Sequence, residues 1–210
     1  MEELDQKEKL LKGADDLFMK YGLRSVSMDD IARHLGVSKK TIYQHFADKD
    51  EVVASVAKSH MIRQRQQFEN IAEKSKNAVE EMVKISFCLK ENMKNINPSV
   101  LFDMQKYHQP AWIEWLKFKQ EFIRENIIRS LKQGIEEGYF RDDVNLEIMA
   151  TMRLEQVQMA FDSNLFPRGQ FSFTEVQAQL FDHYIHGLFT DKGRKLYQKY
   201  KEKNPQPYTI

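Results

Sequence analysis

"SMDDIARHLGVSKKTIYQHFADKDE", residues 27–51, contains two short helical patterns on either side of a tight turn. The Ser27 hydroxyl can cap the first pattern by accepting from the amide of Asp30, and Gly36 can end it in a turn. Ser38 can cap the second pattern, "KKTIYQHF", before Asp48 begins a longer helix. Two short helices joined by such a turn have the spacing of a helix-turn-helix unit.

The apolar side chains of this stretch are spaced to lock its two short helices together. On the second helix Ile42 and Phe46 are four residues apart and share one face, so Lys40 and Gln44 point away from it. A helix of about eight residues is not stable alone, so packing must hold this outward face in place. The apolar positions that form the lock are Ile31, Ala32, Leu35, Val37, Ile42 and Phe46.

The outward face carries side chains suited to reading DNA bases. Lys39 and Lys40 can donate to guanine acceptors, and Gln44 can pair with adenine through two hydrogen bonds. The methyl group of Thr41 can lie against a thymine methyl group. A solvated face with exposed lysines is the alternative, but the turn, the caps and the apolar lock together favour a face that reads a DNA groove.

A second group of side chains can hold the phosphate backbone. Tyr43, His45 and Lys49 can each donate to phosphate oxygens, which fix the register without reading the sequence. The free amides at the helix starts that follow Ser27 and Ser38 attract phosphate as well. The two serines are predicted to be caps whether or not they contact DNA.

The charge of the chain limits how large a nucleic-acid surface can be. The sequence has 32 Lys and Arg against 31 Asp and Glu, which gives a formal charge of +1. Residues 20–50 contain six basic and four acidic residues, a local surplus of two. Such a surplus suits one half-site but not tight binding by a single copy, so we expect two copies to bind together.

The rest of the chain also predicts helices. Glycine and proline number only 8 and 5, and apolar residues recur at spacings of three and four. We therefore predict an all-α protein with a helix-turn-helix DNA-binding domain at residues 1–50 and a larger helical regulatory and dimerisation domain at residues 51–210. The predicted helices span residues 6–21, 27–36, 39–46, 48–68, 75–95, 98–107, 110–137, 145–166 and 172–189.

Composition and motifs argue against several other classes. The start of the chain lacks the pattern of a signal peptide, and no apolar run approaches the ~18 residues of a membrane span, so a cytoplasmic protein with no membrane partner is predicted. Cys88 is the single cysteine, and no catalytic or cofactor-binding motif is present, so we predict no enzyme and no cofactor. His183 and His186 lack a third ligand at sensible spacing, so no metal site is predicted.

The stretch Tyr21–Val53 resembles the signature of the tetracycline-repressor (TetR) family of bacterial transcriptional regulators, and Gly134–Ala150 resembles a looser element of that family. The resemblance implies a homodimer with one three-helix DNA-binding unit per subunit and a larger helical domain that dimerises and holds a ligand pocket. Many members carry a small residue where Lys40 stands, so the operator sequence does not transfer. The matching positions are Ile31, Ala32, Gly36, Val37, Ser38, Tyr43, His45, Phe46 and Lys49.

Large aromatic groups between residues 87 and 115 suggest an adaptable apolar pocket in the larger domain, although ordinary core packing is the alternative for each of them. The two long patterns at residues 145–166 and 172–189 are apolar over a wide arc, which suggests that a second subunit covers one side. The pocket candidates are Phe102, Tyr107, Trp112 and Trp115, with His108 and Gln156 as polar anchors.

These patterns together predict a homodimeric transcriptional regulator, a repressor that binds a pseudo-palindromic double-stranded DNA site and releases it when a small-molecule effector enters the larger domain. The helix that begins at Asp48 would pass the effector signal by changing the separation of the two reading helices. The open alternative is a ligand-independent dimeric DNA-binding protein whose second domain only dimerises or binds a protein partner.

Overall fold

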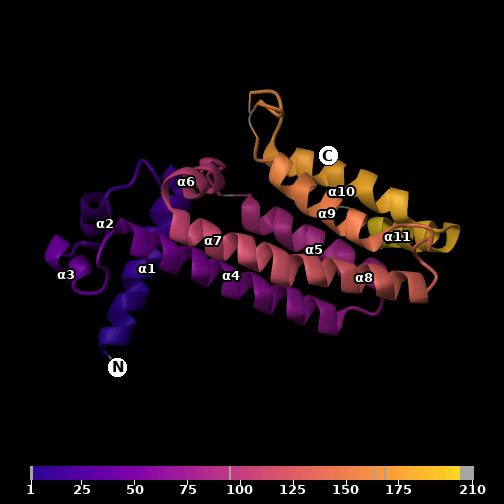
Figure 1. The fold of residues 1–210 in the computed structure, drawn as a ribbon, viewed down its shortest axis with the longest axis horizontal. Helices are drawn as coiled ribbons and strands as arrows, with labels where there is room; N and C mark the ends of the chain where they lie inside the picture. The colour runs from indigo at the N-terminus through magenta and orange to yellow at the C-terminus, as the bar shows by residue number, and fades with distance from the viewer. Residues whose placement is uncertain (1, 95, 163, 168, 204–210) are drawn as a thin grey trace. The chain divides into compact units, whose positions relative to one another are not determined.

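The computed structural model describes residues 2–94, 96–162, 164–167 and 169–203, and these form helices without a β-strand. The prediction of an all-α protein is confirmed. The elements are α1 (Glu2–Tyr21), α2 (Met28–Leu35), α3 (Lys39–Tyr43), α4 (Lys49–Lys74), α5 (Ala78–Met93), α6 (Ser99–Tyr107), α7 (Gln109–Phe118), the π-helix η1 (Lys119–Arg124), α8 (Glu125–Glu136), α9 (Leu146–Met159), α10 (Phe173–Leu188) and α11 (Asp191–Lys203) (Figure 1).

The elements differ from the predicted ranges at several places, among them α4, which continues to Lys74, and α9, which ends at Met159. Helix α3 ends at Tyr43, earlier than predicted, because the His45 amide bonds to the Ile42 carbonyl at 3.0 Å and tightens the chain into a turn. The long helix predicted at residues 110–137 contains the six-residue π-helix η1 between α7 and α8. Helix α11 was not predicted, because its sequence "DKGRKLYQKYKEK" is largely charged.

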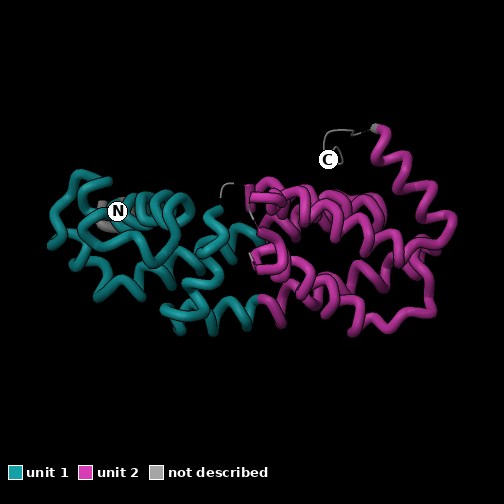
Figure 2. The backbone as a smooth tube through the Cα atoms, turned by 90° about the horizontal axis from the view of Figure 1, so that it is seen from above, with its two compact units in different colours: residues 1–64, 95–118 teal, residues 65–94, 119–210 magenta. Residues whose placement is uncertain are grey.

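The chain forms two compact units, each of which uses separate stretches of sequence (Figure 2). Unit 1 comprises residues 1–64 and 95–118, and unit 2 comprises residues 65–94 and 119–210. Helix α4 therefore begins in unit 1 and ends in unit 2. This division by compactness differs from the predicted boundary at residue 50, which concerned function and stays a prediction.

Unit 1 is built around one apolar core in which the predicted helix-turn-helix residues take part. Phe18 of α1 is completely buried, and Ile31, Ile42 and Phe46 are each at most 2% exposed. Leu35 and Val37 pack against the same core. Burying a side chain of this size stabilises a protein by about 1.5–3 kcal/mol, so these contacts hold the short α2 and α3 in place. The other buried members are Leu10, Ala14, Leu23, Val26, Met28, Ala32, Val52, Val53, Val56, Met104 and Ala111.

Helix α6 is fastened to the turn between α1 and α2 within unit 1. The Arg24 amide donates to the carboxylate of Asp103 at 3.2 Å, and the Ser99 hydroxyl donates to the same oxygen at 3.2 Å. Gly22 has φ +85°, and a Cβ there would lie 2.6 Å from the Ser99 hydroxyl. The close approach of α6 therefore requires glycine at this turn for two reasons, the backbone conformation and the space.

Unit 2 has its own core, formed mainly by α5, α8, α10 and α11 together with the segment after α8. Tyr184 and Ile185 of α10 and Tyr197 of α11 are at most 2% exposed. Packing inside the chain therefore accounts for much of the wide apolar arc predicted for the helix at 172–189. On α9, by contrast, Ile148 and Met152 stay 59% and 38% exposed. In the part of the chain that the structure describes, no helix is long and apolar enough to cross a membrane.

Candidate nucleic-acid interface

Helix α2 and the turn after it adopt the predicted geometry. The Ser27 hydroxyl accepts from the Asp30 amide at 3.2 Å, and the Asp30 carboxylate accepts from the Ser27 amide at 2.9 Å, which makes a reciprocal capping box. The hydrogen bonds from Ser27 lower the pKa of the Asp30 carboxyl. Gly36 ends the helix with φ +65°, a left-handed conformation that favours glycine.

Helix α3 is short and is held at both ends. The Ser38 hydroxyl accepts from the Thr41 amide at 3.1 Å and lies 2.8 Å from the Thr41 hydroxyl. Ile42 is 1% exposed and Phe46 is 2% exposed, so the inner side of the helix is fixed by the core. The two hydroxyls of the cap are engaged with each other, which leaves the Thr41 methyl group as the part suited to a thymine contact.

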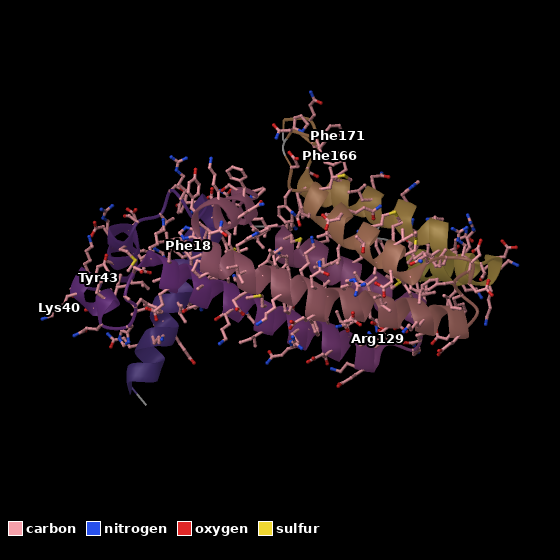
Figure 3. All side chains as sticks on the ribbon, in the orientation of Figure 1. Phe18, Lys40, Tyr43, Arg129, Phe166 and Phe171 are labelled. Atoms are coloured by element: carbon pink, nitrogen blue, oxygen red, sulfur yellow. The ribbon has the colours of Figure 1, made fainter. Side chains whose placement is uncertain are left out.

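The outer side of α3 is polar and open to solvent. Lys40 and Gln44 are exposed, and Tyr43 is 46% exposed. Figure 3 shows Lys40 and Tyr43 on the outer side of this helix. The structure thus brings three of the predicted DNA-contacting side chains together on one rigid surface.

Lys39 differs from Lys40 because it has an acidic partner. Its amine lies 3.0 Å from the carboxylate of Asp29 in α2, and this hydrogen bond raises the pKa of Lys39. Sequence reasoning missed this pair, although the ten-residue separation crosses a turn that returns the chain on itself. An exposed ion pair contributes little to stability, so a DNA phosphate could replace Asp29 at little cost.

His45 and Lys49 lie at the edge of this surface and are both partly buried. Burial lowers the pKa of the Lys49 amine, while the carboxylates of Asp103, Asp50 and Asp30 oppose the shift. The charge around Lys49 is therefore mixed, whereas Lys40 on α3 is exposed to solvent.

The predicted pocket residues of α6 and α7 all lie in unit 1. Phe102 is 58% exposed and Tyr107 is 39% exposed, and the amine of Lys106 lies over both rings at 5.5 and 5.4 Å. Trp112 and Trp115 are partly buried and pack against the unit 1 core.

The two predicted polar anchors have different surroundings. His108 is 6% exposed, and its Nδ1 is hydrogen-bonded to the carboxylate of Asp50 in the first turn of α4. Gln156 lies on α9 in unit 2, and its buried Oε1 has no hydrogen-bond partner among the described residues. A pocket formed by the six candidates remains a prediction.

A buried charge in unit 2 was not predicted from the sequence. Arg153 of α9 is 6% exposed. Arginine normally lies at the surface, so the residue type gave no signal. Its position did carry one, because Arg153 is three residues after Ala150 and four before Val157, which places it on an apolar face. Within the described residues, no group of three or more His, Cys, Asp or Glu side chains could hold a metal ion.

Comparison with known proteins agrees with this geometry. Residues 10–56, which span α1 to the first turns of α4, match the family described as "Bacterial regulatory proteins, tetR family". Residues 10–56 of this chain are therefore a tetR-family domain. Members of this family are transcriptional regulators that bind DNA, and the helix-turn-helix surface on α3 is the candidate DNA-contacting site in this chain.

Relatives along most of the chain carry the same type of name. The uncharacterized HTH-type transcriptional regulator YvaF of Bacillus subtilis (strain 168) is 26% identical over 170 residues, which cover 80% of this chain and 88% of that protein. The HTH-type transcriptional repressor KstR2 of Mycobacterium tuberculosis (strain ATCC 25618 / H37Rv) is 25% identical over 143 residues, 67% of this chain and 72% of that protein.

Solved structures share the fold of this tetR-family chain. The structure of the ketosteroid transcriptional regulator KstR2 of Mycobacterium tuberculosis has a TM-score of 0.64 at 22% identity and covers 88% of this chain and 95% of that one. The SmeT–triclosan complex has a TM-score of 0.69 at 15% identity and covers 89% of this chain and 93% of that one. By the family match and the names of its relatives, the chain is a DNA-binding transcriptional regulator.

Proposed function

We propose that this regulator is a repressor that binds a pseudo-palindromic operator as a homodimer and releases it when a small molecule binds the larger helical domain. Lys39, Lys40, Thr41 and Gln44 would read bases in the major groove. Ser27, Ser38, Tyr43, His45 and Lys49 would contact phosphates. The name of KstR2, a repressor, supports the sign of regulation.

The observation that carries the proposal is the rigid outer face of α3. A five-residue helix has no stability of its own, yet its cap and its buried Ile42 fix its orientation. A face held in this way presents Lys40, Tyr43 and Gln44 on a backbone that needs no further ordering when DNA binds. A solvated face with no function would not need its side chains held so firmly.

Dimerisation is supported by apolar groups that the chain leaves uncovered. Ile148 and Met152 lie four residues apart on α9 and form an exposed apolar stripe. Gly187 lies inside α10, where a Cβ would meet no atom within 4 Å. A glycine in an exposed helix costs about 1 kcal/mol relative to alanine, so a site where a second helix approaches closely would explain its presence.

Coupling to an effector is supported by the way α6 and α7 hold the DNA-binding helices. Asp103 of α6 accepts from the amide of Arg24, and His108 at the start of α7 is bonded to Asp50 of α4. A ligand that prefers one position of these helices would shift α4 and the separation of the two α3 helices, which must match ~34–36 Å. SmeT, which shares the fold, was solved with triclosan bound, so the fold accommodates a small molecule.

The DNA-binding part of the proposal is tested by fluorescence anisotropy with a duplex from the region upstream of the protein's own gene. Lys40→Ala should reduce the preference for that duplex over random DNA, by about 1–3 kcal/mol if Lys40 pairs with a guanine. Tyr43→Phe should weaken binding to both duplexes alike. Lys117→Ala, an exposed lysine of α7, is the matched control and should change neither. If Lys40→Ala and Tyr43→Phe both bind like the wild type, the assigned surface is wrong.

The sign of regulation and the effector are tested separately. A reporter gene under the control of the upstream region should be more active in cells without the protein than in cells with it. Lower activity in cells without the protein would show that the protein is an activator. A compound that stabilises the protein and lowers its affinity for the duplex would support ligand release. A ligand-independent DNA-binding protein would show neither effect with any compound.

A further inference from the structure

Unit 2 contains a charged side chain that its own fold does not satisfy. Arg153 on α9 is 6% exposed, and its Nη1 has no hydrogen-bond partner among the described residues. The guanidinium lies over the rings of Phe181 and Tyr184, 5.1 and 5.9 Å from the ring centroids. Ring faces attract a cation but accept no strong hydrogen bonds, so they compensate only part of the lost hydration.

Arg153 also lines a cavity of about 90 Å³ whose walls come from α5, α9, α10 and α11. A cavity needs only about 10–15 Å³ to hold a water molecule, so this one has room for a small organic group. Apolar walls come from Val83, Leu89 and Phe181. None of the six pocket candidates from the sequence lines this cavity.

The charge around the cavity favours an anion. Its lining contains Arg153, Lys90 and Lys201 as cations and Asp182 as the single carboxylate. Asp182 is already engaged, because it accepts from the Lys201 amine and from the Tyr197 hydroxyl at 2.9 Å. Asp182 is therefore paired with Lys201, and among the described residues no acidic side chain is paired with Arg153.

We infer that this cavity binds the carboxylate of a small apolar acid, with the guanidinium of Arg153 as its partner. The carboxylate would accept from Nη1 in a charge-assisted hydrogen bond, and the short hydrocarbon part would lie against Val83 and Leu89. Arginine suits this task because its guanidinium stays charged and its planar donors match a carboxylate. The inference rests on the proposal that unit 2 receives the effector, and it names the chemical class of that effector.

The binding test uses acetate, propionate and butyrate as probes, with propionamide as the neutral isostere and inorganic phosphate as the other anion. Each is titrated into the full-length isotope-labelled protein without DNA at matched ionic strength, and the NMR signals of Arg153, Phe181 and Tyr184 are followed. Saturable binding of propionate or butyrate, with propionamide at least about tenfold weaker, is expected. Equal binding of propionamide, or no saturable binding of any carboxylate, would overturn the inference. Tighter binding of phosphate than of any carboxylate would also overturn it.

Variants separate Arg153 from a general charge effect. Arg153→Met should lose propionate binding by about tenfold or more, while Arg141→Met, the same change at an exposed arginine of unit 2, should leave it unchanged. Arg153→Lys keeps the charge and serves if the methionine variant does not fold. It should bind more weakly than the wild type, because an ammonium lacks the planar fork, and wild-type affinity in either Arg153 variant would overturn the assignment.

The same probes distinguish this inference from the proposed function. If the protein binds its upstream duplex but no carboxylate, the cavity assignment fails and the DNA-binding function stands. If propionate binds at Arg153 but leaves the affinity for the duplex unchanged, the anion site stands and ligand release fails.

Discussion

Replacing Arg153 with methionine should make the ligand-free protein more stable. The change keeps an unbranched side chain of similar length and removes a buried charge that has no acidic partner among the described residues. Methionine is flexible and packs favourably against aromatic rings such as those of Phe181 and Tyr184. Most core substitutions lower the free energy of unfolding, so an increase here would show that Arg153 is kept for something other than stability.

The size of the effect follows from the surroundings of the guanidinium. Burial lowers the pKa of Arg153 to about 10, with Tyr184 opposing the shift. That value is more than two pKa units below the ordinary one, so keeping the charge in the folded state costs about 3 kcal/mol. The lost attraction to the two rings offsets about 0.5–2 kcal/mol of this gain. A net increase of about 1–2 kcal/mol in the free energy of unfolding is expected, or a few degrees in Tm.

The sign of the pH dependence is fixed by the same values. The pKa of the Arg153 guanidinium is lower in the folded protein than in the unfolded chain. Its charge therefore destabilises the folded protein at every pH at which the group is charged in both states, here below about pH 10. The penalty fades only as pH rises through that value, so a measurement at pH 7 captures it in full. The stability difference between the wild type and Arg153→Met should therefore be constant between pH 6 and 9.

Urea unfolding followed by circular dichroism, at one fixed protein concentration because of the expected dimer, measures the difference. Arg141→Met is the control and should lie within about 0.5 kcal/mol of the wild type. If Arg153→Met is less stable than the wild type by 1 kcal/mol or more while the control is unchanged, the guanidinium is a structural element and the reasoning is refuted.

Three further predictions concern the DNA-binding helices and the dimer. Gly36→Ala should destabilise the protein by about 1–2 kcal/mol, because Gly36 has a positive φ. Gly187→Ala should not destabilise the single chain, because Gly187 has open space around it and an ordinary φ. Urea unfolding of the two variants compares their free energies of unfolding. Asp29→Asn should tighten DNA binding several-fold at low salt by freeing Lys39 and removing a negative charge, and unchanged anisotropy titrations would contradict this. Ile148→Glu should shift the protein toward monomers in sedimentation velocity, and an unchanged oligomeric state would place the dimer interface elsewhere.

Much of the DNA-binding surface could be predicted because its determinants are local. The caps at Ser27 and Ser38 and the turn at Gly36 act within four residues of sequence. The spacing of Ile42 and Phe46 fixes which side of α3 is buried. The length of α3 was overestimated, because the tightening after Tyr43 is a backbone detail that side-chain periodicity does not encode.

No local pattern specifies an effector pocket in the same way, and the six pocket candidates stay a prediction. Phe102 and Tyr107 were chosen because aromatic side chains often line pockets, yet both are more than a third exposed. Trp112 and Trp115 pack on the unit 1 core, the alternative that the sequence left open. Residue type sets what a side chain can do, but burial is decided by which helices pack against it.

By itself the sequence determined the all-helical class, the helix-turn-helix and the solvent-exposed side of α3, because helix periods, caps and turns operate over a few consecutive residues. Only the tertiary structure decided that α6 holds the α1–α2 turn through Asp103 and Arg24, which are 79 residues apart. Only the tertiary structure decided that Arg153 lies buried, with no hydrogen-bond partner for its Nη1 in the part of the chain that the structure describes. Contacts between distant segments depend on how whole helices pack, and no short pattern along the chain encodes that.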